Sequence, residues 1–147
     1  MDKVREIFID TNILIDLASE REPNATYASA LFVIAGKKSI VMNICALSYN
    51  NVHYIIKKRF GRAKAKTTIQ WLSKFTKCLP VNNAIVNQAI VSQFRDFEDA
   101  IQYHCALQIP KCEAIITRNI KDFKWSNIPV KYPESFWIDE VSIKPYL

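Results

Sequence analysis

The stretch IFIDTNILID, residues 7–16, decides the fold. Its first three residues are apolar and β-prone, which is typical of a strand buried on both faces of a sheet. The run ends on a carboxylate, Asp10, and a second apolar run follows that predicts a short helix from Asn12 to about Ser19. Asp10 could cap this helix, or it could bind a metal ion at the rim of the sheet.

Short apolar segments alternate with helical segments along the rest of the chain. This alternation is typical of a parallel sheet with helices on both faces, joined by right-handed crossovers. We therefore expect an α/β fold with three layers, a central, mostly parallel sheet of four or five short strands, and a single domain over residues 1–147. Strands are predicted at 4–10, 39–43, 77–81, 113–117 and 128–132, and helices at 12–19, from about 23 to Gly36, 46–59, 62–75, 82–94 and 96–108, with a final helical turn in PESFW at 133–137.

Composition excludes several classes of protein. No apolar run approaches the roughly 18–20 residues of a membrane span, and the first ten residues have no signal-peptide pattern, so we expect a cytoplasmic protein. Gly36 and Gly61 are the only glycines, which excludes the glycine-rich loops that cradle dinucleotides and nucleoside triphosphates. The four cysteines are scattered and contain no CxxC, which favours buried thiols over a zinc site or disulfides.

The chain carries a net charge of +6, which favours a polyanionic partner. The charge is concentrated in KKRFGRAKAK, residues 57–66, which holds six basic residues and no acid. This segment could contact RNA or could be an ordinary solvated helix end. The candidate RNA-binding residues are Lys57, Lys58, Arg59, Arg62 and Lys64, together with Arg118 after a predicted strand.

Acidic and amide residues gather in four segments, two of which follow predicted strands. The segments are IDTN with Asp10 and Asn12, SYNNVHY with Asn51, DFEDA with Asp96 and Asp99, and ITRNIKDF with Thr117, Asn119 and Asp122. Ligands of parallel α/β sheets bind beyond the carboxyl ends of the strands. Carboxylates gathered there would repel one another without a cation, so a carboxylate pocket in a basic chain favours a divalent metal site near bound phosphate.

The order of these motifs resembles the PIN domain, in its bacterial VapC-like branch, over nearly the whole chain. The resemblance implies a metal-dependent ribonuclease, often the toxin of a type II toxin–antitoxin pair, whose acids hold Mg²⁺ or Mn²⁺ to activate water against an RNA phosphodiester. Carried onto this sequence, it implies catalytic roles for Asp10, Asp99 and Asn119, metal ligation by Asp10, Asp96, Asp99 and Asn119, and supporting roles for Asn12, Asn51, Thr117 and Asp122.

Several of these residues also have simpler roles. Asp96 could be the N-cap of its helix, and Asp99 a first-turn acid stabilised by the helix dipole. Asp122 could be a turn or cap residue, and Arg118 could orient the pocket, touch phosphate or simply lie on the surface. We expect both histidines, His53 and His104, to be structural, because neither has metal-ligand spacing to other candidate ligands.

One departure from the family concerns the helix after the second strand, where relatives commonly carry Glu and this chain carries Asn51 or, in the alternative alignment, Asn50. An amide has no charge and cannot act as a base, so metal binding is weaker unless Glu98 or a water compensates. The alternative hypothesis is therefore a degenerate PIN domain that binds RNA or a protein without cutting. A receiver-like signalling domain fits poorly, because it needs adjacent acids after the first strand. The family resemblance further implies an antitoxin partner and a homodimer, both served by the helices within residues 47–75.

Overall fold

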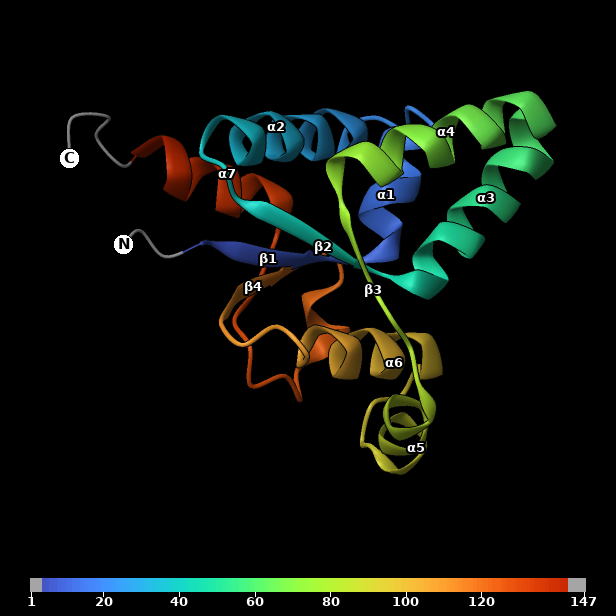
Figure 1. The fold of residues 1–147 in the computed structure, drawn as a ribbon. Coiled ribbons are helices and arrows are strands. Elements are labelled where there is room, and N and C mark those ends of the chain that lie inside the picture. The colour runs from blue at the N-terminus through green and yellow to red at the C-terminus, as the bar shows by residue number, and fades with distance from the viewer. Residues whose placement is uncertain (1–3, 143–147) are drawn as a thin grey trace.

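The computed structural model describes residues 4–142, in which five strands form one parallel sheet in the order β3-β2-β1-β4-β5. Figure 1 shows this sheet between two layers of helices, which confirms the predicted α/β class. The predicted domain, 1–147, extends beyond the described residues at both ends. The strands are β1 (Glu6–Ile9) in the centre, β2 (Val41–Cys45) and β4 (Cys112–Ile116) beside it, and β3 (Lys77–Leu79) and β5 (Val130–Lys131) at the edges.

Alternation along β1 divides the core between the two faces of the sheet. Ile7 and Ile9 belong to one hydrophobic cluster and Phe8 to the other, and all three are fully buried. The first cluster lies under α1 (Thr11–Ala18), α2 (Asn24–Lys37), α3 (Ala46–Phe60), α4 (Arg62–Phe75) and α7 (Pro133–Ser142). The second lies under α5 (Asn83–Val91), α6 (Phe97–Ala106) and the short 3-10 helix η1 (Ile120–Phe123).

The structure differs from the sequence predictions in several local features. Helix α2 continues through Gly36 by one residue, to Lys37, and the PESFW turn extends into a helix of ten residues that buries Phe136. The helix η1 was not predicted. The thiol of Cys78 lies exposed on the edge strand β3, whereas Cys45 and Cys105 are buried as predicted. Within residues 4–142, no helix is both long and apolar enough to cross a bilayer.

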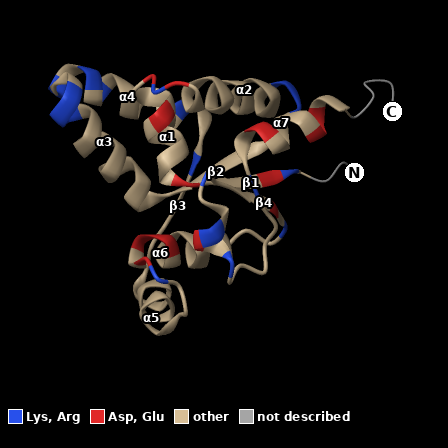
Figure 2. Cartoon of the chain, turned by 180° about the vertical axis from the view of Figure 1, so that it is seen from behind, with Lys and Arg blue, Asp and Glu red and all other residues tan. Residues whose placement is uncertain are grey.

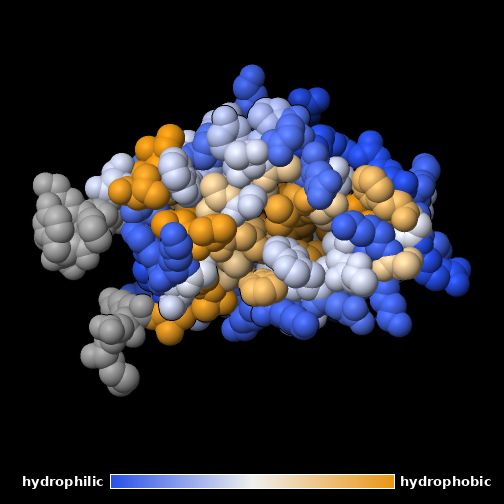
Figure 3. Space-filling model, turned by 90° about the horizontal axis from the view of Figure 1, so that it is seen from above, coloured by the Kyte–Doolittle hydropathy of each residue, from blue (hydrophilic) through white to orange (hydrophobic). Residues whose placement is uncertain are grey.

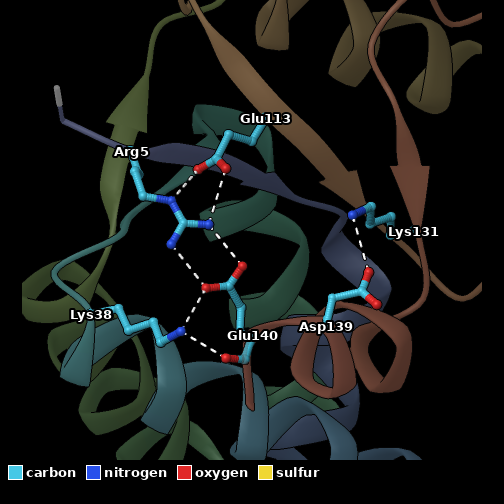
Figure 4. A network of polar contacts seen from close by, with 6 residues as sticks. All are labelled: Arg5, Lys38, Glu113, Lys131, Asp139 and Glu140. Atoms are coloured by element: carbon cyan, nitrogen blue, oxygen red, sulfur yellow. Dashed lines mark hydrogen bonds and ion pairs between the residues drawn. The ribbon is translucent and has the colours of Figure 1, made fainter. Parts of the chain in front are cut away.

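A network of charged residues ties α7 to the start of the sheet (Figure 4). The guanidinium of Arg5 donates to both oxygens of the buried Glu140 at 2.8 and 2.9 Å, and also to Glu113. Lys38 Nζ lies 3.2 Å from the same Glu140 carboxylate. The hydrogen bond from Arg5 holds the pKa of Glu140 below its usual range. This carboxylate is therefore charged, and it anchors the last helix.

We predict that Glu140→Gln lowers the free energy of unfolding by about 2 kcal/mol at pH 7, because hydrogen bonds to charged partners are lost in a buried site. A carboxylate with a lowered pKa contributes stability above its ordinary pKa of 4.5 and loses that contribution as pH falls through the folded-state pKa. The difference between the two proteins should therefore shrink in denaturant titrations below about pH 4.5. The control Asp139→Asn, also on α7, breaks only the exposed ion pair with Lys131 of β5 and should cost less than about 1 kcal/mol. Equal losses in both variants would contradict the assigned role of Glu140.

Candidate active site

The site forms where the two central strands β1 and β4 end side by side. Asp10 follows β1, and its backbone N–H donates to the carbonyl of Ile116, the last residue of β4, at 2.9 Å. Thr117 follows β4, and its hydroxyl donates to Asp10 Oδ2 at 2.7 Å. The parallel pairing of the strands thus brings together two side chains that are 107 residues apart in sequence.

The Asp10 carboxylate is buried, with 1% of the residue exposed, and both of its oxygens accept hydrogen bonds. Gln102 Nε2 donates to Oδ1 at 2.9 Å, opposite the bond from Thr117 to Oδ2. Asp10 occupies the N-cap position of α1, but its side chain makes no capping hydrogen bond. Burial raises the pKa of Asp10, and the bonds from Thr117 and Gln102 partly offset this effect. The side chain is therefore held in a fixed orientation that capping of α1 does not explain.

Three buried polar side chains form the floor beneath Asp10. Gln102 Oε1 accepts from the backbone N–H of Thr11 at 3.0 Å and from its hydroxyl at 3.1 Å. That hydroxyl also lies 2.7 Å from the hydroxyl of Ser48 on α3. Gln102 thus connects α6 to the start of α1. Its amide oxygen accepts from Thr11 and its amide nitrogen donates to Asp10, so both atoms hold site residues in place.

Helix α6 brings a second group of carboxylates to this edge of the sheet. Asp96 is the N-cap, because its Oδ1 accepts the backbone N–H of Asp99 at 2.9 Å. Asp99 is half-buried, and burial together with four neighbouring carboxylates raises its pKa to about 8. These neighbours, in order of decreasing effect, are Asp10, Asp96, Asp122 and Glu98. Figure 2 shows the acidic start of α6 lying below the end of β1.

Glu98 lies next to the residue at which this chain departs from the family pattern. Burial raises the pKa of its carboxyl, while the nearby polar side chains of Thr11 and Asn51 partly lower it. Asn51 comes from α3 and is half-buried. A carboxylate from α6 therefore lies near the amide on α3, and compensation by Glu98 stays a prediction.

The other predicted site residues lie around this cluster at different depths. Asn119 is half-buried, and its backbone N–H donates to Thr117 Oγ1 at 3.0 Å. Within residues 4–142, no hydrogen bond joins its side chain to Asp10 or Asp99. Asp122 is exposed on η1, close enough to raise the pKa of Asp99. Asn12 is the second residue of α1 and is half-buried.

The candidate RNA-binding residues fall into two different environments. Arg118 is held in place, because its Nε donates to Asp16 Oδ2 at 2.6 Å and its Nη2 to Oδ1 at 3.3 Å. Asp16 is fully buried on α1. The basic residues of 57–66 are instead exposed around the turn between α3 and α4, where Gly61 adopts a φ of +92°. Figure 2 shows this basic turn at the far end of the α3–α4 pair from the sheet.

Comparison with known proteins assigns the family. The model of the PIN domain family matches residues 6–121, which is most of the chain. The chain belongs to the PIN domain family. Ribonuclease VapC1 of Aquifex aeolicus (strain VF5) is 28% identical over 137 residues, which cover 89% of this chain and 92% of the relative. The similarity therefore lies with the VapC-like branch.

Solved structures share the PIN fold. A toxin–antitoxin complex from Klebsiella pneumoniae matches with a TM-score of 0.60 and 25% identity, covering 86% of this chain and 97% of that chain. VapC20 of Mycobacterium tuberculosis, a sarcin-ricin loop cleaving toxin, matches with a TM-score of 0.59 and 17% identity, over 74% and 86% of the two chains. The complex VapBC2 from Rickettsia felis, bound to promoter DNA, has a TM-score of 0.62 at 12% identity, over 86% and 98%.

The donor atoms of this PIN domain are suited to a hard divalent cation. Within residues 4–142, no group of three or more His, Cys, Asp or Glu side chains is arranged to hold a metal ion. However, Mg²⁺ keeps several waters and needs only one or two protein carboxylates. Asp10 and Asp99 supply two from different elements, and the mutual repulsion that raises the pKa of Asp99 would be relieved by a cation. The residues present therefore fit such an ion.

Sequence reasoning missed three residues that hold the site of the PIN domain together. Gln102 lies three residues after Asp99 on the same helix face, which was its only signal in the sequence. Asp16 was visible as a lone carboxylate in an apolar helix, which calls for a buried partner. Ser48 gave no signal, because its contact with Thr11 depends on how α3 packs against α1.

Proposed function

We propose that this PIN domain protein is a divalent-metal-dependent endoribonuclease that hydrolyses RNA phosphodiester bonds. The observation that carries the proposal is that Asp10, directly after β1, lies close enough to Asp99 on α6 to raise the pKa of that carboxyl, in a chain of net charge +6. Similarity to a ribonuclease of the VapC type, spread over nine-tenths of both chains, supports the same activity. Gathered carboxylates next to a polyanionic substrate make sense only if a cation screens them.

In such a site, some residues would bind the metal ion and others would orient the residues that bind it. A bound Mg²⁺ or Mn²⁺ supplies a nucleophile from water and neutralises charge on the phosphate. Asp10 and Asp99 would hold the ion, with Asn119 and Asp96 at its periphery. Thr117 and Gln102 fix both oxygens of Asp10, Thr11 fixes Gln102, and Ser48 in turn contacts Thr11. Glu98 and Asn51 supply further oxygen atoms beside Thr11.

The direct test is cleavage of RNA by the purified protein in the presence of different ions. We expect cleavage with Mg²⁺ or Mn²⁺, complete loss in EDTA, and recovery when excess metal is returned. Calorimetric titration with Mn²⁺ separates this function from that of a degenerate domain, because a degenerate site would bind RNA without binding the ion. Cleavage that survives EDTA would contradict the proposal.

We also propose that the protein is the toxin of a type II pair and binds an antitoxin. Similarity to solved toxin–antitoxin complexes supports this partner. A groove of about 340 Å³ lies between the end of α1 and α4, lined by Leu17, Trp71 and Leu72 with Lys64 at its side. Figure 3 shows hydrophobic residues gathered in a hollow between the helices of this face. Co-purification with the product of a neighbouring reading frame tests the pairing, and a toxin that purifies alone when both are expressed contradicts it.

The proposed homodimer would use the exposed aromatic surface of the helices in 47–75. Tyr54, Trp71 and Phe75 are 61%, 40% and 52% exposed, which is more apolar surface than a solvated helix pair needs. Light scattering of the purified protein measures the oligomeric state directly, and a monomer at high concentration would contradict the dimer.

A further inference from the structure

A second cavity lies on the opposite side of the sheet from the α1–α4 groove, against the outer face of α6. Its volume is about 410 Å³, within the range of sites that bind small organic groups. Aromatic rings form half of its wall: Phe94 before α6, Tyr103 and His104 on α6, and Trp125 after η1. The proposed hydrolysis of RNA, as described so far, assigns no role to this cavity.

Three residues in the wall of the cavity lie close in the sequence to residues of the carboxylate cluster. Phe94 lies two residues before Asp96 in the sequence, and Trp125 lies three residues after Asp122. Tyr103 lies four residues after Asp99, which is one helical turn or about 6 Å along α6. Asp96 and Asp122 both lie close enough to Asp99 to raise the pKa of its carboxyl, so the segments that carry Phe94 and Trp125 both begin near Asp99. The cavity therefore lies one helical turn or more along α6 from the carboxylate cluster.

The rings are packed as a platform with an open face. Phe94 stacks on Tyr103 with ring centroids 5.0 Å apart, and Phe123 meets Phe94 edge-on from the core. The Tyr103 hydroxyl accepts the backbone N–H of Asn127 at 3.1 Å, which fixes this ring. The Trp125 residue is 47% exposed, so part of this residue is open to a ligand. Such rings stack unpaired nucleobases of any sequence.

His104 adds a polar group of defined character to this platform. Its Nδ1 lies 2.8 Å from the carbonyl of Ala100, and because a carbonyl only accepts, Nδ1 carries the proton. In the neutral ring, Nε2 is then an acceptor for an N–H group of a ligand. The side chains of Gln93 and Asn127, also in the wall, can both donate and accept. This combination matches the edge of a nucleobase.

Three basic residues lie in the segments that also carry Phe94 and Trp125. Arg95, Lys121 and Lys124 are exposed, and no ion pair within the described part of the chain involves them. The ammonium of Lys124 lies 5.2 Å from the centroid of the Trp125 ring. These cations can follow the phosphates of a strand whose base enters the cavity.

We infer that this cavity binds an unpaired nucleobase of the RNA strand next to the phosphate held at the carboxylate cluster. The inference rests on the proposed ribonuclease function and adds a substrate requirement to it. A base can reach the cavity only if it is unstacked, so the preferred substrates are single-stranded or looped RNA.

The test uses the Asp99→Asn background, which prevents cleavage, and a short single-stranded RNA that carries one 2-aminopurine. The fluorescence of this base falls when it stacks on an aromatic ring. We expect quenching on binding, and a loss of about tenfold in affinity together with the quenching when Trp125→Ala is added. Trp125→Phe should keep most of both. The matched control is Trp137→Ala on α7, which removes a tryptophan of similar exposure, 39%, from the other side of the sheet.

Salt dependence separates stacking from contacts with phosphate. Trp125→Ala should leave the slope of log affinity against log salt unchanged, while Lys124→Ala should reduce it by about 0.7. Trp125→Leu keeps the volume without the ring, so it gives the same answer if the alanine variant fails to fold. Unchanged affinity and quenching in Trp125→Ala or Trp125→Leu would overturn the inference. Failure of the nuclease itself is distinguishable, because the wild type would then bind and quench the probe without cutting RNA.

Discussion

The Asp99→Asn variant is expected to lose at least about 100-fold in kcat/KM for RNA cleavage, equivalent to several kcal/mol of transition-state stabilisation. Asp99 is one of the two carboxylates proposed to hold the ion, and Asn keeps its size while removing its charge. Because burial and four neighbouring acids raise the pKa of Asp99 to about 8, its charge is a cost to the metal-free fold. Thermal denaturation of the metal-free variant at pH 9 should therefore show a higher Tm than that of the wild type.

Two further measurements complete this prediction. Mn²⁺ should raise the Tm of the wild type and raise that of Asp99→Asn much less, because only a bound ion stabilises the folded state. Asp139→Asn on α7 is the matched control, since it removes an exposed carboxylate remote from the site and should cleave at the wild-type rate. Wild-type cleavage by Asp99→Asn would refute the assignment of Asp99.

The Gln102→Leu variant is expected to be less stable by about 2 to 4 kcal/mol, measured by denaturant unfolding. Leu fills a similar volume but leaves the Thr11 N–H and one oxygen of Asp10 without partners in a buried site, at a cost of about 1–3 kcal/mol each. Cleavage should also fall by about 10- to 100-fold, because the orientation of Asp10 is no longer fixed.

The control for Gln102→Leu is a variant that is similarly destabilised but leaves Asp10 correctly oriented. Ile85→Ala creates a cavity in the core under α5 and should cost a similar amount, about 2–5 kcal/mol, without touching Asp10. Assayed well below both melting temperatures, Ile85→Ala should cleave normally while Gln102→Leu remains slow and requires more Mn²⁺. Equal cleavage by the two variants would reduce Gln102 to a purely structural residue.

The sequence predicted those parts of the fold that depend on local patterns. The apolar run before Asp10 identified the central strand, and hydrophobic spacing with Pro and Gly signals located the helices within a few residues of their bounds. At PESFW the same patterns predicted only one helical turn. Helix α7 is longer because it depends on packing of Phe136 and on the ion pairs of Glu140 with Arg5 and Lys38. Contacts between elements remote in sequence leave no periodic signal.

The sequence likewise predicted only part of the candidate site. Asp10 and Thr117 follow strands, and this position alone placed them at one edge of the sheet. The partners that orient them were not predictable: Gln102 meets Asp10 across 92 residues and Arg118 meets Asp16 across 102. A capping role for Asp96 could be read from its spacing to Asp99, whereas the facing of Glu98 and Asn51 required the packed positions of α6 and α3.

The central position of β1 has a consequence for biosynthesis. Translation releases this strand well before one of its two neighbours, β4, which comprises residues 112–116. Pairing across such a contact order is slow and cannot begin until β4 has left the ribosome. A nascent chain interrupted before Thr117 would display Asp10 but lack the hydroxyl that orients it, so premature termination products should be inert.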